Sequence, residues 1–361
     1  MGTTLSEPIT EKTILSQENA NFKVVSCAMQ GWRRSMEDTS IVNLNLSNSN
    51  YSVRGKKSAF FGVFDGHSGE RAALFVAQNL TRYITGTSEY KNAQYSKALS
   101  KGFLDCDQAL RKHKYMKGDT SGTTAITMLI KRTKIYIANA GDSRCIACTN
   151  EGQAEEWSQD HKPYLESECS RIIKAGGKVE IGRINGKLAV SRGFGDFHYK
   201  SDMYLKAEDQ LVIATPDIKV KELSSEKYKF AILASDGIWD VMENGEVVDF
   251  VAEKLANFVK PEKICEELMD ACIAKDEKSG RMLGIGMDNM TVILVCFLLD
   301  KSYNEFVQDM KEVVQSETFI KCKEEHEENK IKRMQEKLLG LHDDDIENGE
   351  KSIEATQPCT E

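Results

Sequence analysis

The chain has 361 residues and a formal net charge of −8, and 40% of its residues are hydrophobic. This length allows one large domain or two modest ones, and the negative charge argues against nucleic acid as a partner. The longest apolar run, residues 292–299, is too short to span a membrane. Residues 1–20 hold no apolar export signal and the cysteines follow no regular framework, so we expect reduced thiols in the cytoplasm or nucleus.

The first six residues fit the pattern for N-myristoylation, with Gly2 exposed after removal of Met1 and Ser6 at the required position. A single acyl chain gives only marginal, reversible membrane binding. Residues 2–20 contain one lysine, so a basic patch that could strengthen the anchor is missing there. We assign residues 1–21 to an N-terminal segment and predict weak peripheral membrane contact at most.

Residues 22–300 predict a mixed domain that is rich in short strands. Runs of β-branched and aromatic residues predict strands at 24–29, 58–64, 123–130, 134–139, 230–234 and 290–297. Apolar residues at helical spacing predict helices at 69–84, 92–113, 165–175, 245–257 and 261–274. The strands come in clusters instead of alternating strictly with helices. This order favours an α+β fold with sheets packed against helices over a doubly wound parallel sheet.

Three of the predicted strands begin or end close to an aspartate. The strand at 58–64 stops at Asp65, the strand at 230–234 leads to Asp236, and Asp288 precedes the strand at 290–297. A side chain at the end of a core strand is held rigidly and still opens to solvent. Oxygen ligands suit Mg²⁺ and Mn²⁺, and Gly66 has no Cβ to keep its carbonyl from an ion. The pattern indicates a metal site.

Glu37 and Asp38 form a further acidic pair directly after Arg33 and Arg34. An arginine beside a carboxylate–metal cluster is a natural clamp for phosphate, because its planar fork binds two oxygens. Each of these features also has a plainer explanation when taken singly. A strand that stops at Asp-Gly is most often followed by an ordinary turn, and Gly-Asp at 141–142 predicts a hairpin.

The C-terminal tail, residues 301–361, carries 9 basic and 16 acidic residues. Because the balance changes directly after the last apolar run, we place a domain boundary at residue 300. Apolar spacing within 306–314 and 331–341 predicts two short amphipathic helices. The acidic runs at 324–328 and 343–345 are typical of solvated surface, and the composition from about residue 343 predicts disorder.

A series of short motifs follows in order along the chain. The series begins with Gly-Trp-Arg-Arg-Ser-Met-Glu-Asp at 31–38 and Phe-Asp-Gly-His at 64–67. It continues with Ser-Gly-Thr-Thr-Ala at 121–125, Ala-Gly-Asp-Ser-Arg at 140–144, Asp-His-Lys-Pro at 160–163, Leu-Ala-Val-Ser-Arg at 188–192, Gly-Asp at 195–196, Ser-Asp-Gly-Ile-Trp-Asp at 235–240 and Asp-Asn-Met-Thr at 288–291. Taken in this order, the set resembles the metal-dependent protein phosphatases of type 2C, and it is far more specific than any single motif.

This resemblance covers roughly residues 22–300 and implies that they form a catalytic domain. The implied fold has two stacked antiparallel β-sheets flanked by α-helices, with a metal centre at one edge of the sandwich. The implied activity is hydrolysis of phosphoserine and phosphothreonine monoesters in phosphoprotein substrates. Water activated between two divalent ions, Mg²⁺ or Mn²⁺, would be the nucleophile. We expect a monomer.

The resemblance also assigns metal ligands by position in the motifs. It implies that Asp65 bridges both ions and that the carbonyl oxygen of Gly66 binds one of them. Asp236 and Asp288 would bind the other ion. A weaker third metal site is implied for Asp236 together with two further aspartates, Asp142 and Asp240.

The remaining assignments concern water, phosphate and proton transfer. The resemblance implies that Glu37 and Asp38 hold water molecules bound to the ions, that Arg33 clamps the phosphate and that His67 is the general acid. Two alternatives remain open at this point. One is a pseudophosphatase, a catalytically silent binding module with the same fold. The other is an aspartyl-phosphate enzyme, which needs a second aspartate where this chain has His67.

Overall fold

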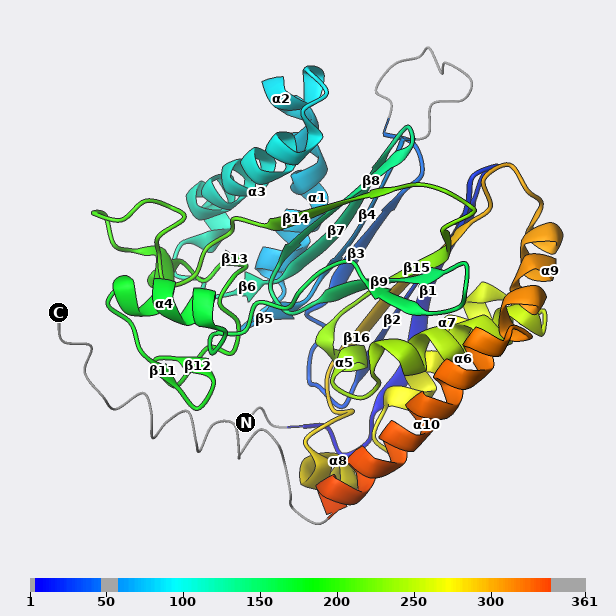
Figure 1. Ribbon diagram of the computed structural model, residues 1–361. Helices are drawn as coiled ribbons and strands as arrows, with labels where there is room; N and C mark the ends of the chain where they lie inside the picture. Colours follow the sequence, from blue (N-terminus) through cyan, green and yellow to red (C-terminus); the bar gives the residue numbers. More distant parts are fainter. Residues whose placement is uncertain (1–3, 47–57, 339–361) are drawn as a thin grey trace.

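The computed structural model describes residues 4–46 and 58–338. The predicted acylation site at Gly2 and the acidic run at 343–345 therefore lie outside the described residues. Two antiparallel sheets stack face to face in the middle of the molecule (Figure 1). The larger sheet has the strand order β1 (Ile9–Glu18), β2 (Phe22–Gly31), β16 (Met290–Phe297), β15 (Tyr228–Ala234), β9 (Arg144–Thr149) and β10 (Ala154–Glu156). The smaller sheet has the order β14 (Asp217–Glu222), β8 (Lys134–Ala140), β7 (Ala125–Lys131), β4 (Ser58–Phe64) and β3 (Thr39–Asn43).

Strand β16 shows why the central strands are apolar throughout. Ile293 and Val295 pack into the core between the sheets, whereas Val292 and Leu294 pack into the core beneath the helices on the outer face. Successive side chains of a strand point to opposite faces, so a strand covered on both faces needs an unbroken apolar run. The run at 292–299 is therefore the mark of a strand that is buried on both sides.

Helices cover the outer face of each sheet, which gives four layers (Figure 1). The smaller sheet is covered by α1 (Arg71–Gly86) and α3 (Tyr95–Lys112), and the larger one by α6 (Asn244–Ala256), α7 (Pro261–Cys272) and α9 (Tyr303–Val314). The predicted sandwich flanked by helices is confirmed. No helix within the described residues is long and apolar enough to cross a membrane.

The strands that the sequence analysis missed lie mainly at sheet edges. Strand β1 has several exposed apolar side chains, and β14, Asp-Ile-Lys-Val-Lys-Glu, is largely exposed and charged. Neither strand shows the apolar pattern that marks a buried strand. The hairpin predicted at Gly-Asp 141–142 is wrong, because the turn there crosses from β8 in the smaller sheet to β9 in the larger sheet and the two strands do not pair.

The described part of the C-terminal tail, residues 301–338, forms two helices that pack in different ways. Helix α9 begins after Ser302, whose Oγ accepts a hydrogen bond from the backbone nitrogen of Glu305, and buries Phe306 and Met310 in the core. Residues 331–338 of the helix predicted at 331–341 belong to a longer one, α10 (Glu317–Leu338), which packs on α6. Its ion pairs to α6 include Arg333 with Glu246. A domain boundary at residue 300 remains a prediction.

Residues 164–215 form a side lobe beside the sandwich, at the left of Figure 1. The lobe contains α4 (Glu166–Lys174), β11 (Val179–Glu180), β12 (Arg183–Ile184) and a short 3₁₀ helix, η2 (Phe197–Lys200). Its small apolar core is formed by Ile172, Ile184, Tyr199 and Val212.

Candidate functional site

Strands β4, β15 and β16 bring three aspartates to one cleft. Asp65 follows β4, Asp236 begins the short helix α5 (Asp236–Trp239) after β15, and Asp288 precedes β16. Strands β15 and β16 are antiparallel partners with Ala234 opposite Val292, so the end of one lies beside the start of the other. Strand β4 belongs to the facing sheet, and all three carboxylates line a cleft of about 760 Å³.

Asn289 ties the loop after β2 to the start of β16. Its Nδ2 donates hydrogen bonds to the carbonyl oxygens of Gln30 and Ser35 at 2.8 and 3.0 Å. Its Oδ1 accepts from the backbone nitrogen of Glu37 at 2.9 Å. Because the side chain is buried, losing one of these bonds would leave a polar group unsatisfied. The sequence placed Asn289 in a motif but gave no sign of this role.

Ser235 fixes the second acidic residue of the same loop. Its Oγ donates to Asp38 Oδ2 at 2.9 Å and accepts from the backbone nitrogen of Thr291 at 3.0 Å. Burial raises the pKa of Asp38 to about 7 and the charge of Asp288 adds to the rise, although hydrogen bonds from Thr291 and Ser235 oppose it. Asp38 is thus held in place at a high electrostatic cost.

Gly66 allows this loop to lie directly against the end of β4. A Cβ at position 66 would come within 2.2 Å of the carbonyl oxygen of Glu37, so no larger residue fits without moving the backbone. Thr124 braces the neighbouring residue, because its backbone nitrogen donates to the carbonyl oxygen of Asp65 at 2.9 Å and its Oγ1 accepts from the backbone nitrogen of Asp65 at 3.2 Å.

The cleft aspartates repel one another in a partly buried setting. The pKa values of Asp65 and Asp236 are raised well above the usual range, first by burial and then by the neighbouring carboxylates. The pKa of Asp288 is also raised by burial, with Arg33 opposing the rise. Buried like charges are costly unless a cation neutralises them.

The donor set fits hard divalent cations. It consists of carboxylates and the Gly66 carbonyl at the ends of rigid strands, and bound cations would remove the repulsion just described. Among the described residues, no three His, Cys, Asp or Glu side chains converge closely enough to hold an ion by themselves. Mg²⁺ is usually held by one or two carboxylates and keeps several waters, so a tight cage of three is not required.

Two basic side chains already reach into the acidic cleft. Arg33, which is half exposed, forms an ion pair with Asp288. Lys162 Nζ lies 2.5 Å from Asp142 Oδ2. Burial alone would lower the pKa of Lys162, but the negative charges of Asp142 and Asp236 outweigh this effect and raise it. Lys162 stands in a sequence motif, yet its contact with Asp142 is visible only in the structure.

His67 lines the cleft and is held by an aspartate of the side lobe. Its Nε2 lies 2.7 Å from Asp196 Oδ2, and Asp196 is almost fully buried. Burial alone would lower the pKa of His67, but the charge and hydrogen bond of Asp196 raise it. The backbone of Asp196 is left-handed, with a φ of 51°, which is strained for a residue other than glycine.

The other predicted acidic residues lie around the same cleft. Glu37 Oε2 accepts from the backbone nitrogen of Gly69 at 3.0 Å, and its Oε1 accepts from Ser35 Oγ at 2.8 Å. The backbone nitrogen of Asp240 donates to the carbonyl oxygen of Asp236 at 2.8 Å, so helix α5 sets the spacing of this pair. Among the described residues, the structure thus brings together all of the predicted site residues.

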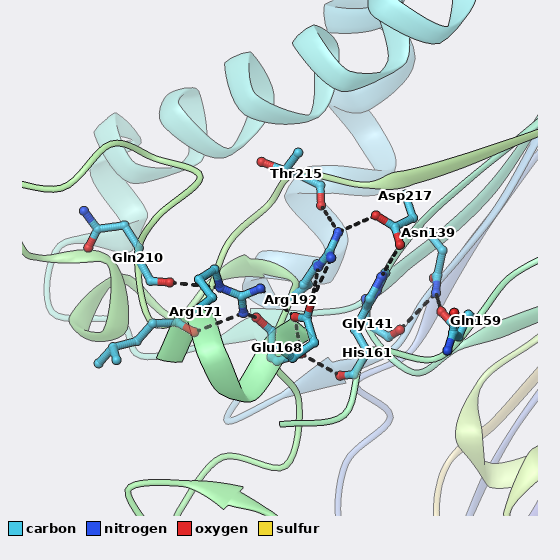
Figure 2. A network of polar contacts seen from close by, with 12 residues as sticks. Asn139, Gly141, Gln159, His161, Glu168, Arg171, Arg192, Gln210, Thr215 and Asp217 are labelled. Carbon is cyan, nitrogen blue, oxygen red and sulfur yellow. Dashed lines mark hydrogen bonds and ion pairs between the residues drawn. The ribbon is translucent and has the colours of Figure 1, made fainter. Parts of the chain in front are cut away.

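A second buried charged cluster lies at the base of the side lobe (Figure 2). The carboxylate of Glu168 accepts hydrogen bonds from Arg192 at 2.6 and 3.0 Å, from Arg171 at 2.7 Å and from Ser191 Oγ at 2.6 Å. Burial opposes ionisation, yet these partners lower the pKa of Glu168 to about 2. Here each negative charge has its positive partners.

This cluster continues from the side lobe to the cleft. Arg192 also donates to Asp217 at 2.7 Å, and Asp217 Oδ2 lies 3.2 Å from His161 Nε2. His161 Nδ1 accepts from the backbone nitrogen of Gly141 at 3.2 Å, so the proton of the neutral ring is on Nε2. The network therefore joins the lobe to β14 and to the turn that carries Asp142 (Figure 2).

Comparison with known proteins gives a consistent result. Residues 22–279 match the family model described as Protein phosphatase 2C. A probable protein phosphatase 2C of Caenorhabditis elegans is 46% identical over 84% of this chain and 82% of its own length. A protein phosphatase 2C homolog of Schizosaccharomyces pombe is 44% identical over 85% and 83%, respectively. A crystal structure of a phosphatase from Toxoplasma gondii aligns with a TM-score of 0.66 at 26% identity, over 80% of this chain and 96% of that one.

Proposed function

The chain belongs to the protein phosphatase 2C family of serine/threonine phosphatases, and we propose that the cleft around Asp65 is its catalytic centre. One observation carries this assignment. Three strand ends deliver partly buried, mutually repelling carboxylates to a cleft that also contains Arg33 and His67. Such strongly perturbed acids in a cleft are typical of a functional site.

The metal ligands in this proposal are Asp65, the Gly66 carbonyl, Asp236 and Asp288. Two Mg²⁺ or Mn²⁺ ions, when bound there, would supply positive charge and acidify the water that attacks phosphorus. Glu37 and Asp38 lie beside these ligands and would accept hydrogen bonds from water molecules bound to the ions. A weaker third ion would be held by Asp236 with two further carboxylates, Asp142 and Asp240.

Arg33 would orient the phosphate. Its guanidinium is half exposed at the cleft and its planar fork can bind two phosphoryl oxygens. A metal ion bound to Asp288 would compete with the ion pair between Arg33 and Asp288. The donors of Arg33 would then be free to bind the substrate. Fixed positive charge aimed at these oxygens stabilises the transition state more than the ground state.

His67 would transfer a proton to the departing serine or threonine oxygen. Its contact with Asp196 favours the protonated ring and uses Nε2. The proton available to the leaving group is then the one on Nδ1. Asp196 keeps the ring orientation fixed, which general acid catalysis requires.

A leaving-group comparison tests this assignment. The replacement His67→Gln should reduce hydrolysis of an alkyl phosphate much more than hydrolysis of an aryl phosphate, because only the alkoxide needs a proton to depart. Turnover of both substrates with and without Mn²⁺ is the measurement. Equal losses on the two substrates would contradict the role of His67 as the general acid. Wild-type turnover that does not depend on Mn²⁺ would contradict the metal assignment.

The substrates in this proposal are phosphoproteins, and the enzyme is a monomer in the cytoplasm or nucleus. Acylation of Gly2 would add a small membrane-associated fraction. Intact-mass analysis of the protein from its native cells decides this point, since an unmodified or acetylated N-terminus would exclude the acyl chain.

A further inference from the structure

The charges that line the cleft fall into two groups of opposite sign. The carboxylates of the proposed metal centre form an acidic floor that consists of Glu37, Asp65, Asp142, Asp236, Asp240 and Asp288. All other charged residues of the cleft are basic, namely Arg33, Arg34, Lys162, Arg183 and Lys187. Bound cations would neutralise the negative charge of the acidic floor. The basic residues would then make the net charge of the cleft surface positive.

Among the described residues, three of these basic side chains have no carboxylate partner and can form an ion pair with a ligand. Lys162 and Arg33 are paired with aspartates of the floor. Arg34, Arg183 and Lys187 are exposed, and among the described residues none of them has an ion pair with a carboxylate. We call these three residues the basic rim.

The side lobe holds two members of the basic rim against the cleft. The carboxylate nearest to Arg183 along the hairpin is its cross-strand partner Glu180, which does not line the cleft. Arg183 Nη1 donates to the carbonyl oxygen of Lys187 at 2.9 Å, which fixes this turn. Of the charged side chains of the lobe, only the basic ones of Arg183 and Lys187 line the cleft.

The lobe is attached by buried contacts, so the backbone that carries Arg183 and Lys187 is held in position. Its own apolar core and the Glu168 network join it to β14 and to the β8–β9 turn (Figure 2). A surface that is ordered before binding loses less entropy when a ligand arrives.

We propose that the basic rim binds carboxylates beside the phosphorylated residue, so that the enzyme prefers acidic phosphopeptide segments as substrates. This inference rests on the proposed function, which places the phosphate at Arg33. A protein with net charge −8 repels an acidic ligand overall, and a local basic rim reverses that repulsion where the substrate enters.

The expected size of the preference follows from the exposure of the rim. Solvent-exposed ion pairs contribute little individually, so two or three of them predict an advantage of about 5- to 10-fold in kcat/KM for an acidic over a basic peptide. The advantage should shrink in high salt, because charges are screened over roughly 10 Å at 0.1 M.

The test uses three phosphothreonine peptides that differ only in flanking residues: glutamate, alanine or lysine. We expect kcat/KM to decrease in that order with the full chain in saturating Mn²⁺. In the double variant Arg183→Glu/Lys187→Glu, the preference should vanish or reverse when each peptide rate is normalised to aryl phosphate turnover of the same variant. Lys174→Glu, an exposed charge reversal on α4 away from the cleft, is the matched control and should keep the preference.

The outcomes separate this inference from the proposed function. Equal kcat/KM for the three peptides would overturn the inference alone. A loss of kcat/KM in the double variant that is as large for the aryl phosphate as for the peptides would also overturn it, because the rim would then act on the phosphate itself. No turnover of any substrate by the unmodified chain would overturn the proposed function, and this inference with it.

Discussion

The acidic floor of the cleft and the Glu168 cluster use buried charge in opposite ways. Glu168 is surrounded by arginines and its pKa is lowered to about 2. Asp65 and Asp236 are surrounded by other carboxylates, and their pKa values are raised well above normal. Glu168 is almost fully buried, whereas Asp65 and Asp236 are only partly buried, yet the pKa of Glu168 is the one that is lowered. Burial itself therefore does not explain the difference.

The difference shows how a structural cluster of charges can be told from a functional one. A cluster that supports the fold contains its own counter-ions, because an unpaired buried charge destabilises the native state. A cluster that leaves its carboxylates unbalanced costs stability and needs positive charge from outside. The Glu168 cluster is complete within the chain, whereas the cleft is completed by cations and substrate.

Replacing Asp65 should separate activity from stability most strongly. Asp65→Asn should reduce kcat by ~10³-fold or more, on the scale of losing a metal-activated nucleophile. The same change removes one of the repelling charges, so Tm of the ion-free protein should stay the same or rise. Steady-state kinetics in Mn²⁺ and thermal unfolding without ions measure the two effects. Near-normal Mn²⁺-dependent turnover would contradict the role of Asp65.

Replacing Arg33 tests the positive side of the cleft. Arg33→Ala should lower kcat/KM by ~10²-fold, and Arg33→Lys should restore only part of it, because an ammonium group lacks the planar fork. Kinetics on an aryl phosphate suffice for this measurement. Full rescue by lysine would mean that charge alone matters at this position and would rule out a two-point clamp.

Replacing Glu168 should give the reverse of the Asp65 result. Glu168→Gln leaves Arg171 and Arg192 without their buried carboxylate, so it should lower the free energy of unfolding by about 3 kcal/mol. Denaturant unfolding measures this loss. Glu166→Gln, on the exposed face of the same helix, is the matched control and should change stability by less than about 0.5 kcal/mol. Similar losses in the two variants would show that Glu168 does not act through its arginines.

Asp38, whose pKa is raised by burial and by Asp288 of the acidic floor, and Glu168 should also respond to pH with opposite signs. The native state keeps a proton on Asp38 up to about pH 7, whereas the unfolded chain loses it near pH 4, so raising the pH across this window destabilises the ion-free protein. Glu168 contributes stability above about pH 4.5 that is lost as the pH falls toward 2. Thermal unfolding should therefore show greatest stability near pH 4–5, and Asp38→Asn should flatten the limb above it. A Tm that rises steadily from pH 4 to 7 would contradict this prediction.

The sequence predicted most of the buried strands and the positions of the three cleft aspartates, because an unbroken apolar run next to Asp is a local pattern. It missed the buried strand β9, whose apolar run is only four residues long. The roles of these residues came from resemblance, since one strand-end aspartate looks like any other turn residue. Partner residues such as Asn289, Ser235 and Asp196 could not be predicted from pattern alone. Asp196, for example, meets His67 across 129 positions of sequence, and no periodicity links two such residues.

The position of β16 in the larger sheet also has a consequence for synthesis. This strand pairs with β2 on one side and with β15 on the other, so the hairpin of β1 and β2 cannot join the sheet until residues 290–297 have left the ribosome. During nearly the whole of translation, one edge of β2 lacks its partner strand. Exposed strand edges on a nascent chain promote aggregation. We therefore expect the growing chain to rely on chaperones until its last core strand emerges.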